Sequence, residues 1–298
     1  MGTSTTLVSN YSTNISVSRL TYNKVFIAYA TSSSYKYLNG IVCDISGTTI
    51  APGTATELVE TAGAGAVISA VCLHSTRVFI AHSSDATDYK LNGIVCDISG
   101  TTITAGTDTT LVSTTNSANS ISIGVLSTTK VVISHFFKVL TSYNIGVKLC
   151  TISGTTATYA TITVSSMARI EPSSYSTYKP ISIAVLNANK VCVIYPDTKY
   201  DYLCKAMCTI PGSTEIIVHS STSVQTSGVG AVFSSQALNE NTIFIAHSSD
   251  TNAYFLNGRV EKQLVKTVTS SDSNYELAGV ANADIPIDTL GEVWVPNV

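Results

Sequence analysis

The stretch LNGIVCDISGTTI occupies residues 38–50, and the same letters return without change at residues 91–103. Identity over such a length indicates a repeated structural unit. Alignment on the cysteine of this stretch adds NIGVKLCTISG around Cys150 and YLCKAMCTIPG around Cys208. A fifth copy, FLNGRVEKQ, has Glu261 in place of the cysteine. The chain therefore consists largely of five units with a period of about 53 residues.

The composition favours an all-β protein. Charged residues make up only 12% of the chain, about half the usual share, and Val, Ile, Thr and Tyr fill the runs between turn residues. A hydrophobic content of 44% is enough for a sizeable core. The net charge of −3 offers no basic face for nucleic acid. No apolar run approaches the roughly 18 residues that span a bilayer, so we expect no membrane insertion, and the start MGTSTTLVSN does not resemble a signal peptide.

Each unit contains four strand candidates, which in the second unit cover residues 67–73, 77–82, 90–99 and 101–112. Four antiparallel strands in about 50 residues is the pattern of a β-propeller blade. A β-sandwich is the alternative, but nothing in a sandwich requires this repeat. The sequence thus predicts an all-β, five-bladed β-propeller with four-stranded blades.

The two ends of the chain suggest how the propeller closes. The fifth unit stops near Gln263 without a fourth strand, whereas GTSTTLVS from Gly2 matches GTDTTLVS from Gly106. We therefore expect the N-terminal strand to complete the last blade, which would remove an open sheet edge. The propeller would span residues 1–263. Residues 264–298 break the period and are expected to form a small C-terminal β extension for attachment or oligomerisation.

The seven cysteines do not read as a disulfide framework. Cys43, Cys96, Cys150 and Cys208 occupy one position in four different blades, too far apart to bridge. We interpret them as buried thiols of a protein assembled in a reducing compartment. Their spacing predicts no metal site, and no cofactor motif is present.

The loops predict which rim of the propeller binds. The turns between strands one and two and between strands three and four are short and repetitive, whereas the remaining loops are longer, divergent and rich in tyrosine. Variable loops on a rigid scaffold are typical of binding surfaces. Tyrosine beside Ser, Asn and Asp suits a polar ligand such as a sugar, although such residues can equally pack between blades. The candidate ligand-binding residues are Tyr37, Tyr89, Tyr143, Tyr202, Tyr254, Tyr175, Tyr178, His82, His135 and His247.

Two alternatives concern the histidines and aspartates near that rim. The histidines end the second strands and could ring a channel mouth, but hydrogen-bonded, partly buried rings are the preferred interpretation. Loop aspartates such as Asp85 and Asp88 could bind a cation, but turn residues are the simpler interpretation. No catalytic residue is predicted. Glycosidases need converging carboxylates, and the first strands contain no Asp or Glu.

The repeats DISGTTIT and the C-terminal segment with GVA and GEVWV resemble sequences in bacteriophage and prophage tail-fibre proteins. The resemblance implies a virion protein that is assembled in the host cytoplasm and acts at the bacterial surface. The implied partners are a host surface glycan or protein receptor, other virion proteins through the C-terminal segment, and a second copy in a homo-oligomer. We expect a non-enzymatic, receptor-binding propeller that recognises a bacterial glycan. The alternatives are a free-standing lectin-like propeller and a purely structural virion spacer.

Overall fold

The computed structural model describes residues 4–9, 12–31, 34–85, 87–139, 142–154, 161–170, 180–197, 202–212, 215–225, 233–248 and 256–262. Every helix or strand assigned in these residues is a β-strand, so the all-β prediction is confirmed. In the same residues no helix is long and apolar enough to cross a membrane. Contacts divide the chain into residues 1–263 and 264–298, and the predicted C-terminal extension lies outside the described residues.

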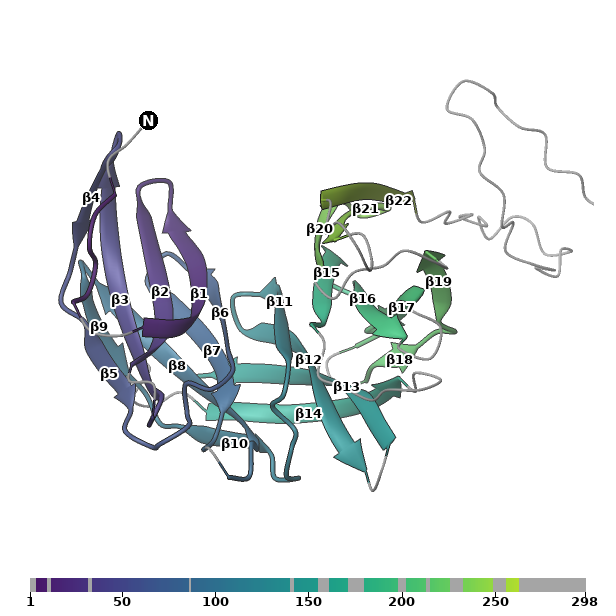
Figure 1. Cartoon of the computed structure of the whole chain (residues 1–298). Coiled ribbons are helices and arrows are strands. Elements are labelled where there is room, and N and C mark those ends of the chain that lie inside the picture. Colours follow the sequence, from purple (N-terminus) through teal and green to yellow (C-terminus); the bar gives the residue numbers. More distant parts are fainter. Residues whose placement is uncertain are drawn as a thin grey trace, which may run out of the picture. The chain divides into compact units, whose positions relative to one another are not determined.

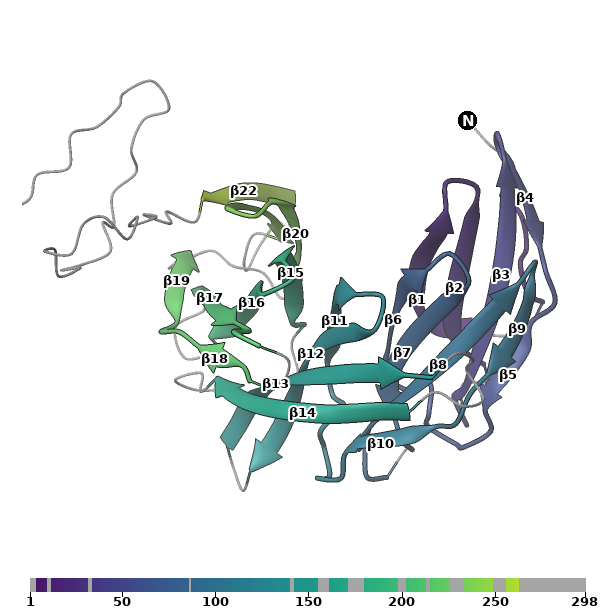
Figure 2. The same ribbon diagram turned by 180° about the vertical axis from the view of Figure 1, so that it is seen from behind.

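The strands form five antiparallel sheets in chain order (Figures 1 and 2). The first sheet contains β1 (Ser12–Thr21), β2 (Lys24–Thr31), β3 (Tyr37–Ser46), β4 (Thr49–Pro52) and β5 (Thr56–Val59). The second contains β6 (Ile68–His74), β7 (Arg77–Ser83), β8 (Leu91–Ser99), β9 (Thr102–Ala105) and β10 (Thr109–Val112). The third contains β11 (Ile121–Ser127), β12 (Lys130–Val139), β13 (Ser142–Ser153) and β14 (Thr161–Ile170). The fourth contains β15 (Ser182–Asn187), β16 (Lys190–Asp197), β17 (Tyr202–Thr209), β18 (Ile217–Val218) and β19 (Thr222–Gln225), and the fifth β20 (Phe233–Asn239), β21 (Thr242–Ser248) and β22 (Leu256–Lys262).

The fourth strand of the repeat differs from the prediction. In the second sheet the expected strand over residues 101–112 is split into β9 and β10, which both pair with β8. The break comes at Gly106, whose N–H donates to the carbonyl of Val95 at 2.8 Å. At the matching Gly53 a Cβ would lie only 2.6 Å from the Cβ of Thr101. A glycine is therefore needed where the chain crosses this crowded point.

Four apolar clusters each join one sheet to the next. Between the first and second sheets, Phe26 and Ala28 of β2 pack in the same cluster as Val78 and Ile80 of β7. Because β7 is covered by the first sheet on one face and by the third sheet on the other, its residues are apolar on both sides. The sheets thus stack in chain order through their flat faces.

Serine hydroxyls on the first strands add hydrogen bonds between sheets. The N–H of Ala70 in β6 donates to Oγ of Ser16 in β1 at 2.9 Å. The equivalent bond reaches Ser122 of β11 from Ile183 at 3.0 Å, and Ser182 of β15 from Ser235 at 2.9 Å. The serines of the first strands therefore hold neighbouring sheets together, a role that sequence analysis missed.

The outward faces of the first and fifth sheets lack such a neighbour. Leu238, Phe244 and Val260 of the fifth sheet are 58%, 38% and 54% exposed, and Ile15 and Val17 of β1 are 63% and 60% exposed. In the described residues no extensive contact joins β20 to β1, and the fifth sheet has β22 at its edge. The predicted closure of five blades is therefore not seen, because the faces that would meet are uncovered.

The N-terminal segment nevertheless occupies a recognisable place. Leu7 and Val8 pack against the cluster of Tyr29, Ile41 and Cys43 on the outward face of the first sheet. The matching residues Leu58 and Val59 pack against the second sheet in the same way. Leu7 and Val8 thus lie where the outer strand of a preceding blade would be, although residues 4–9 form no strand.

All seven cysteines are free thiols. Cys96, Cys150, Cys192 and Cys208 are buried between sheets, and this burial raises the pKa of each thiol to about 12. These thiols are protonated core side chains, and a thiol must ionise before it can act as a nucleophile.

Candidate functional site

The structure holds two of the predicted tyrosines in defined positions on the loop-rich rim. The rings of Tyr35 and Tyr37 stack with centroids 5.7 Å apart and an interplanar angle of 6°. Tyr89 has a φ of 49°, and its carbonyl accepts hydrogen bonds from the N–H groups of Ser117 at 2.9 Å and Ala118 at 2.8 Å. A non-glycine residue in this conformation is uncommon and points to a constrained turn.

The remaining tyrosines are not brought to one place. Tyr202 is half-buried and packs against the core between the third and fourth sheets, which is the packing role considered as the alternative. Tyr143 pairs with Lys138 in the β12–β13 ladder. Tyr175, Tyr178 and Tyr254 lie outside the described residues.

The three predicted histidines are buried rather than exposed on the rim. His82 and His135 have no exposed surface, and His247 is 3% exposed. Their rings lie between sheets because the ends of the second strands are covered by the neighbouring unit. The prediction that the three histidines contact a ligand directly on an open rim is therefore corrected. Their Nδ1 atoms lie 2.7, 2.8 and 3.1 Å from the carbonyl oxygens of Ser83, Ser117 and Ser248, respectively.

His82 belongs to a polar cluster in the second sheet that contains a carboxylate. Its Nε2 lies 3.0 Å from Oδ1 of Asp108, whose Oδ2 accepts a 2.9 Å hydrogen bond from Nδ2 of Asn92. Burial raises the pKa of the Asp108 carboxyl, but hydrogen bonds from His82 and Asn92 outweigh this effect, so the pKa lies below its usual value. The second sheet therefore supplies its own carboxylate to the histidine.

His135 occupies the equivalent place in the third sheet without that carboxylate. Its Nδ1 donates to the carbonyl of Ser117 at 2.8 Å, whereas Nε2 is buried with no hydrogen-bond partner. The residue opposite is Gly146 rather than asparagine, and a Cβ there would lie 2.3 Å from Nε2. Burial lowers the pKa of His135 to about 4, so the ring is neutral near pH 7 with Nε2 as an acceptor.

A hollow of about 200 Å³ lies beside His135, between the second and third sheets. Its walls come from the end of β10 and the following connection, the end of β12 and the middle of β13. The lining residues are Leu111, Val112, Ser113, Thr114, His135, Phe137 and Lys148. The hollow combines hydroxyls, an aromatic ring, an unpaired acceptor and one cation, and sequence analysis had singled out only His135 among them.

Lys148 is the unusual member of this hollow. Its side chain is half-buried, and among the described residues it has no ion pair or hydrogen bond. Burial is the main reason that the pKa of its ammonium group is lowered. A partly desolvated cation without a partner is costly for folding, which is why Lys148 is of functional interest.

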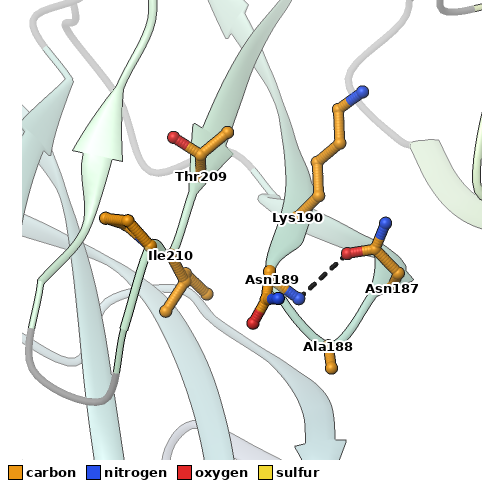
Figure 3. Close-up of a pocket in the computed structure, with 7 residues that line it drawn as sticks. Asn187, Ala188, Asn189, Lys190, Thr209 and Ile210 are labelled. Atoms are coloured by element: carbon orange, nitrogen blue, oxygen red, sulfur yellow. Dashed lines mark hydrogen bonds between the residues drawn. The ribbon is translucent and has the colours of Figure 1, made fainter. Parts of the chain in front are cut away.

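The larger hollow has a different origin. It measures about 420 Å³ and surrounds the turn from Asn187 to Lys190 on the rim of short turns (Figure 3). The side-chain oxygen of Asn187 accepts a 2.9 Å hydrogen bond from the N–H of Asn189, and Asn239 and Asn241 repeat it at 2.9 Å in the fifth sheet. Since the same bond recurs, these polar groups serve the turn rather than a ligand.

The loop aspartates also serve local structure. Oδ1 of Asp85 accepts hydrogen bonds from the N–H groups of Thr87 at 2.7 Å and Asp88 at 2.6 Å. Within the described ranges no group of three His, Cys, Asp or Glu side chains could hold a metal ion. Asp85 therefore shapes its turn.

Comparisons with known proteins support the fold class alone. No family model and no curated protein matches the chain. A protein of unknown function from Dyadobacter fermentans has a similar structure, with a TM-score of 0.50 and 11% identity over 85% of this chain and 77% of that one. A neuraminidase-like protein of subtype N10 from A/little yellow-shouldered bat/Guatemala/060/2010 has a TM-score of 0.43 and 9% identity over 85% and 84% of the two chains.

Proposed function

We propose that residues 1–263 close into a five-bladed propeller whose loop-rich rim is a non-enzymatic, receptor-binding surface of a phage virion. The receptor is a bacterial surface glycan. The observation that carries the binding proposal is the contrast between the two rims. On one, the asparagine side chains are used within repeated turns; on the other, a hollow between sheets collects hydroxyls, an aromatic ring and an unpaired cation.

Closure is supported by the uncovered apolar face of the fifth sheet. Leu238, Phe244 and Val260 are the equivalents of Leu20, Phe26 and Val42, which are buried against the second sheet. Exposed apolar faces of this kind mark interfaces. In the closed form, Leu7 and Val8 belong to a fourth strand beside β22.

Removal of residues 1–9 tests the closure. It should uncover the cluster of Tyr29, Ile41 and Cys43 and leave the edge of β22 open, so we expect aggregation or a clear fall in melting temperature. A truncated protein that remains monomeric with an unchanged melting temperature would exclude the N-terminal strand from closure.

The virion assignment is supported by the sequence resemblance to tail-fibre proteins, and we assign attachment to other virion proteins to residues 264–298. A non-enzymatic role is favoured because β1, β6, β11, β15 and β20, the first strands of the five sheets, contain no Asp or Glu. Carbohydrate hydrolysis would need a pair of such residues at a common site.

Attachment to host cells tests the binding rim. Tyr37→Ala and Tyr89→Ala should weaken attachment, whereas Tyr22→Ala is a matched control because Tyr22 is 93% exposed on the rim of short turns. Truncation of a tyrosine hot spot costs about 2 kcal/mol, or roughly thirtyfold in affinity. Equal effects of all three substitutions would refute the rim assignment. Loss of attachment only when residues 264–298 are deleted would make the propeller a spacer.

A further inference from the structure

We propose that the hollow between the second and third sheets binds a carboxylate-bearing saccharide unit of the hexuronic acid type, with Lys148 pairing the carboxylate. This inference rests on the proposed glycan-binding function and names the class of sugar and the residue that selects it.

The position of Lys148 in the repeat is the first argument. In the β-ladders, Lys148 pairs with Ile133 as Ile41 pairs with Ile27 and Ile94 with Ile80. The equivalents in the first, second and fourth sheets are therefore the buried apolar residues Ile41, Ile94 and Ala206. Lysine stands at a position that the first, second and fourth sheets fill with a buried apolar side chain.

The fifth sheet shows how the fold compensates a cation at this position. There the equivalent residue is Arg259, and its guanidinium donates to the carboxylate of Glu261, which also pairs with Lys205 at 2.8 Å. Lys148 has no such carboxylate among the described residues. An anion from outside the chain would complete the pair.

The comparison with His82 provides the second, independent argument. Asp108 directly precedes Thr109, which pairs with Gly93 in the second sheet. The carboxylate of Asp108 lies beside the His82 ring. In the third sheet the residue that β14 places opposite Lys148 is Met167. The built-in carboxylate of the second sheet therefore has no counterpart at the matching ladder position of the third sheet, and a hollow lies beside His135 there.

The other walls describe the rest of the ligand. The His135 ring has its proton on Nδ1 and is neutral, so it forms part of the wall without adding a charge. The hydroxyls of Ser113 and Thr114 can bond to further hydroxyls, and Phe137 forms an apolar wall. Small-molecule sites usually measure about 300–1,000 Å³, so a hollow of about 200 Å³ suits one sugar ring rather than an oligosaccharide.

The charge favours a carboxylate over a phosphate. One ammonium group balances one negative charge, and the neutral His135 adds none. A phosphate monoester carries nearly two negative charges at pH 7, which would leave an uncompensated charge in a partly buried site.

The test compares glucuronate, glucose and acetate as probes of the full-length protein by NMR titration. Wild-type protein should bind glucuronate more tightly than glucose, and the variant Lys148→Ile should weaken glucuronate binding at least about tenfold while binding glucose as before. Acetate should compete with glucuronate, because both offer the carboxylate.

The stability of the variant provides a second readout. Because isoleucine is the residue of the first and second sheets at this position, Lys148→Ile should unfold at a higher urea concentration than wild type; Lys148→Met serves as a second variant. Equal binding of glucose and glucuronate, or undiminished glucuronate binding by a folded Lys148→Ile, would overturn the proposal. If cells are still bound through the Tyr37 and Tyr89 rim in that case, the receptor-binding function stands and only this site is refuted.

Discussion

The substitution Leu238→Asp distinguishes a closed propeller from a chain with two free end faces. Leu238 is 58% exposed at the end of β20. Its equivalents Leu20, Leu73 and Leu186 are only 5–7% exposed, because each faces the next sheet. In a closed ring Leu238 becomes buried against the first sheet in the same way.

The open and the closed form predict different losses in the free energy of unfolding for Leu238→Asp. If the face stays open, an aspartate at a half-exposed position changes the free energy of unfolding by about 0.5 kcal/mol or less. If the ring is closed, the substitution loses about 2 kcal/mol from leucine burial and adds the cost of an unpaired buried carboxylate. The total should then exceed about 4 kcal/mol, a large part of the stability of an ordinary domain.

Urea unfolding followed by fluorescence measures this difference. Leu73→Asp is the positive control for a buried interface, and Tyr22→Asp is the control for an exposed residue. A destabilisation of Leu238→Asp close to that of Leu73→Asp supports closure, provided that it does not depend on protein concentration. Stability like that of Tyr22→Asp would refute closure, and a concentration-dependent loss would show that a second copy covers the face instead.

The stability of the protein at low pH and the reactivity of its thiols give two further predictions. Because burial lowers the pKa of His135 from 6.5 to about 4, the unfolded chain binds its proton first as the pH falls through this window, and stability should fall by about 3 kcal/mol. Urea unfolding at several pH values should show this loss in wild type and not in His135→Tyr, and equal slopes in both would contradict it. In native protein at about pH 8, Cys72, which is partly exposed, should react with a thiol reagent well before Cys96 and Cys150, whose pKa values are about 12; equal rates would show that the sheets open readily.

Much of the fold could be predicted because the repeat displays the same strand pattern five times. The predicted strand over residues 90–99 is observed as Leu91–Ser99. The split of the fourth strand was missed because it depends on a close approach between two sheets at Gly53, which involves Thr101 from the next unit. Burial of His82 was considered, but its pairing with Asp108 depends on a local fold of β10 that periodicity does not reveal.

The candidate site could be predicted only in part from the sequence. The hollow is lined partly by Ser113 and Thr114, which belong to one of the long loops that the sequence singled out, and His135 was also selected. The lack of a hydrogen-bond partner for Nε2 of His135 depends on Gly146 and on the burial of Nε2. Lys148 could have been found by comparing the residues two positions before each repeated cysteine, where Ile41 and Ile94 make the lysine stand out.

A glycan array probed with the full-length protein tests the receptor-binding account most directly. We predict that wild-type protein retains bacterial glycans that contain uronic acid, that Tyr89→Ala weakens this retention, and that Tyr22→Ala does not. Absence of retention by every glycan, together with undiminished attachment of Tyr89→Ala to host cells, would contradict a glycan-binding rim.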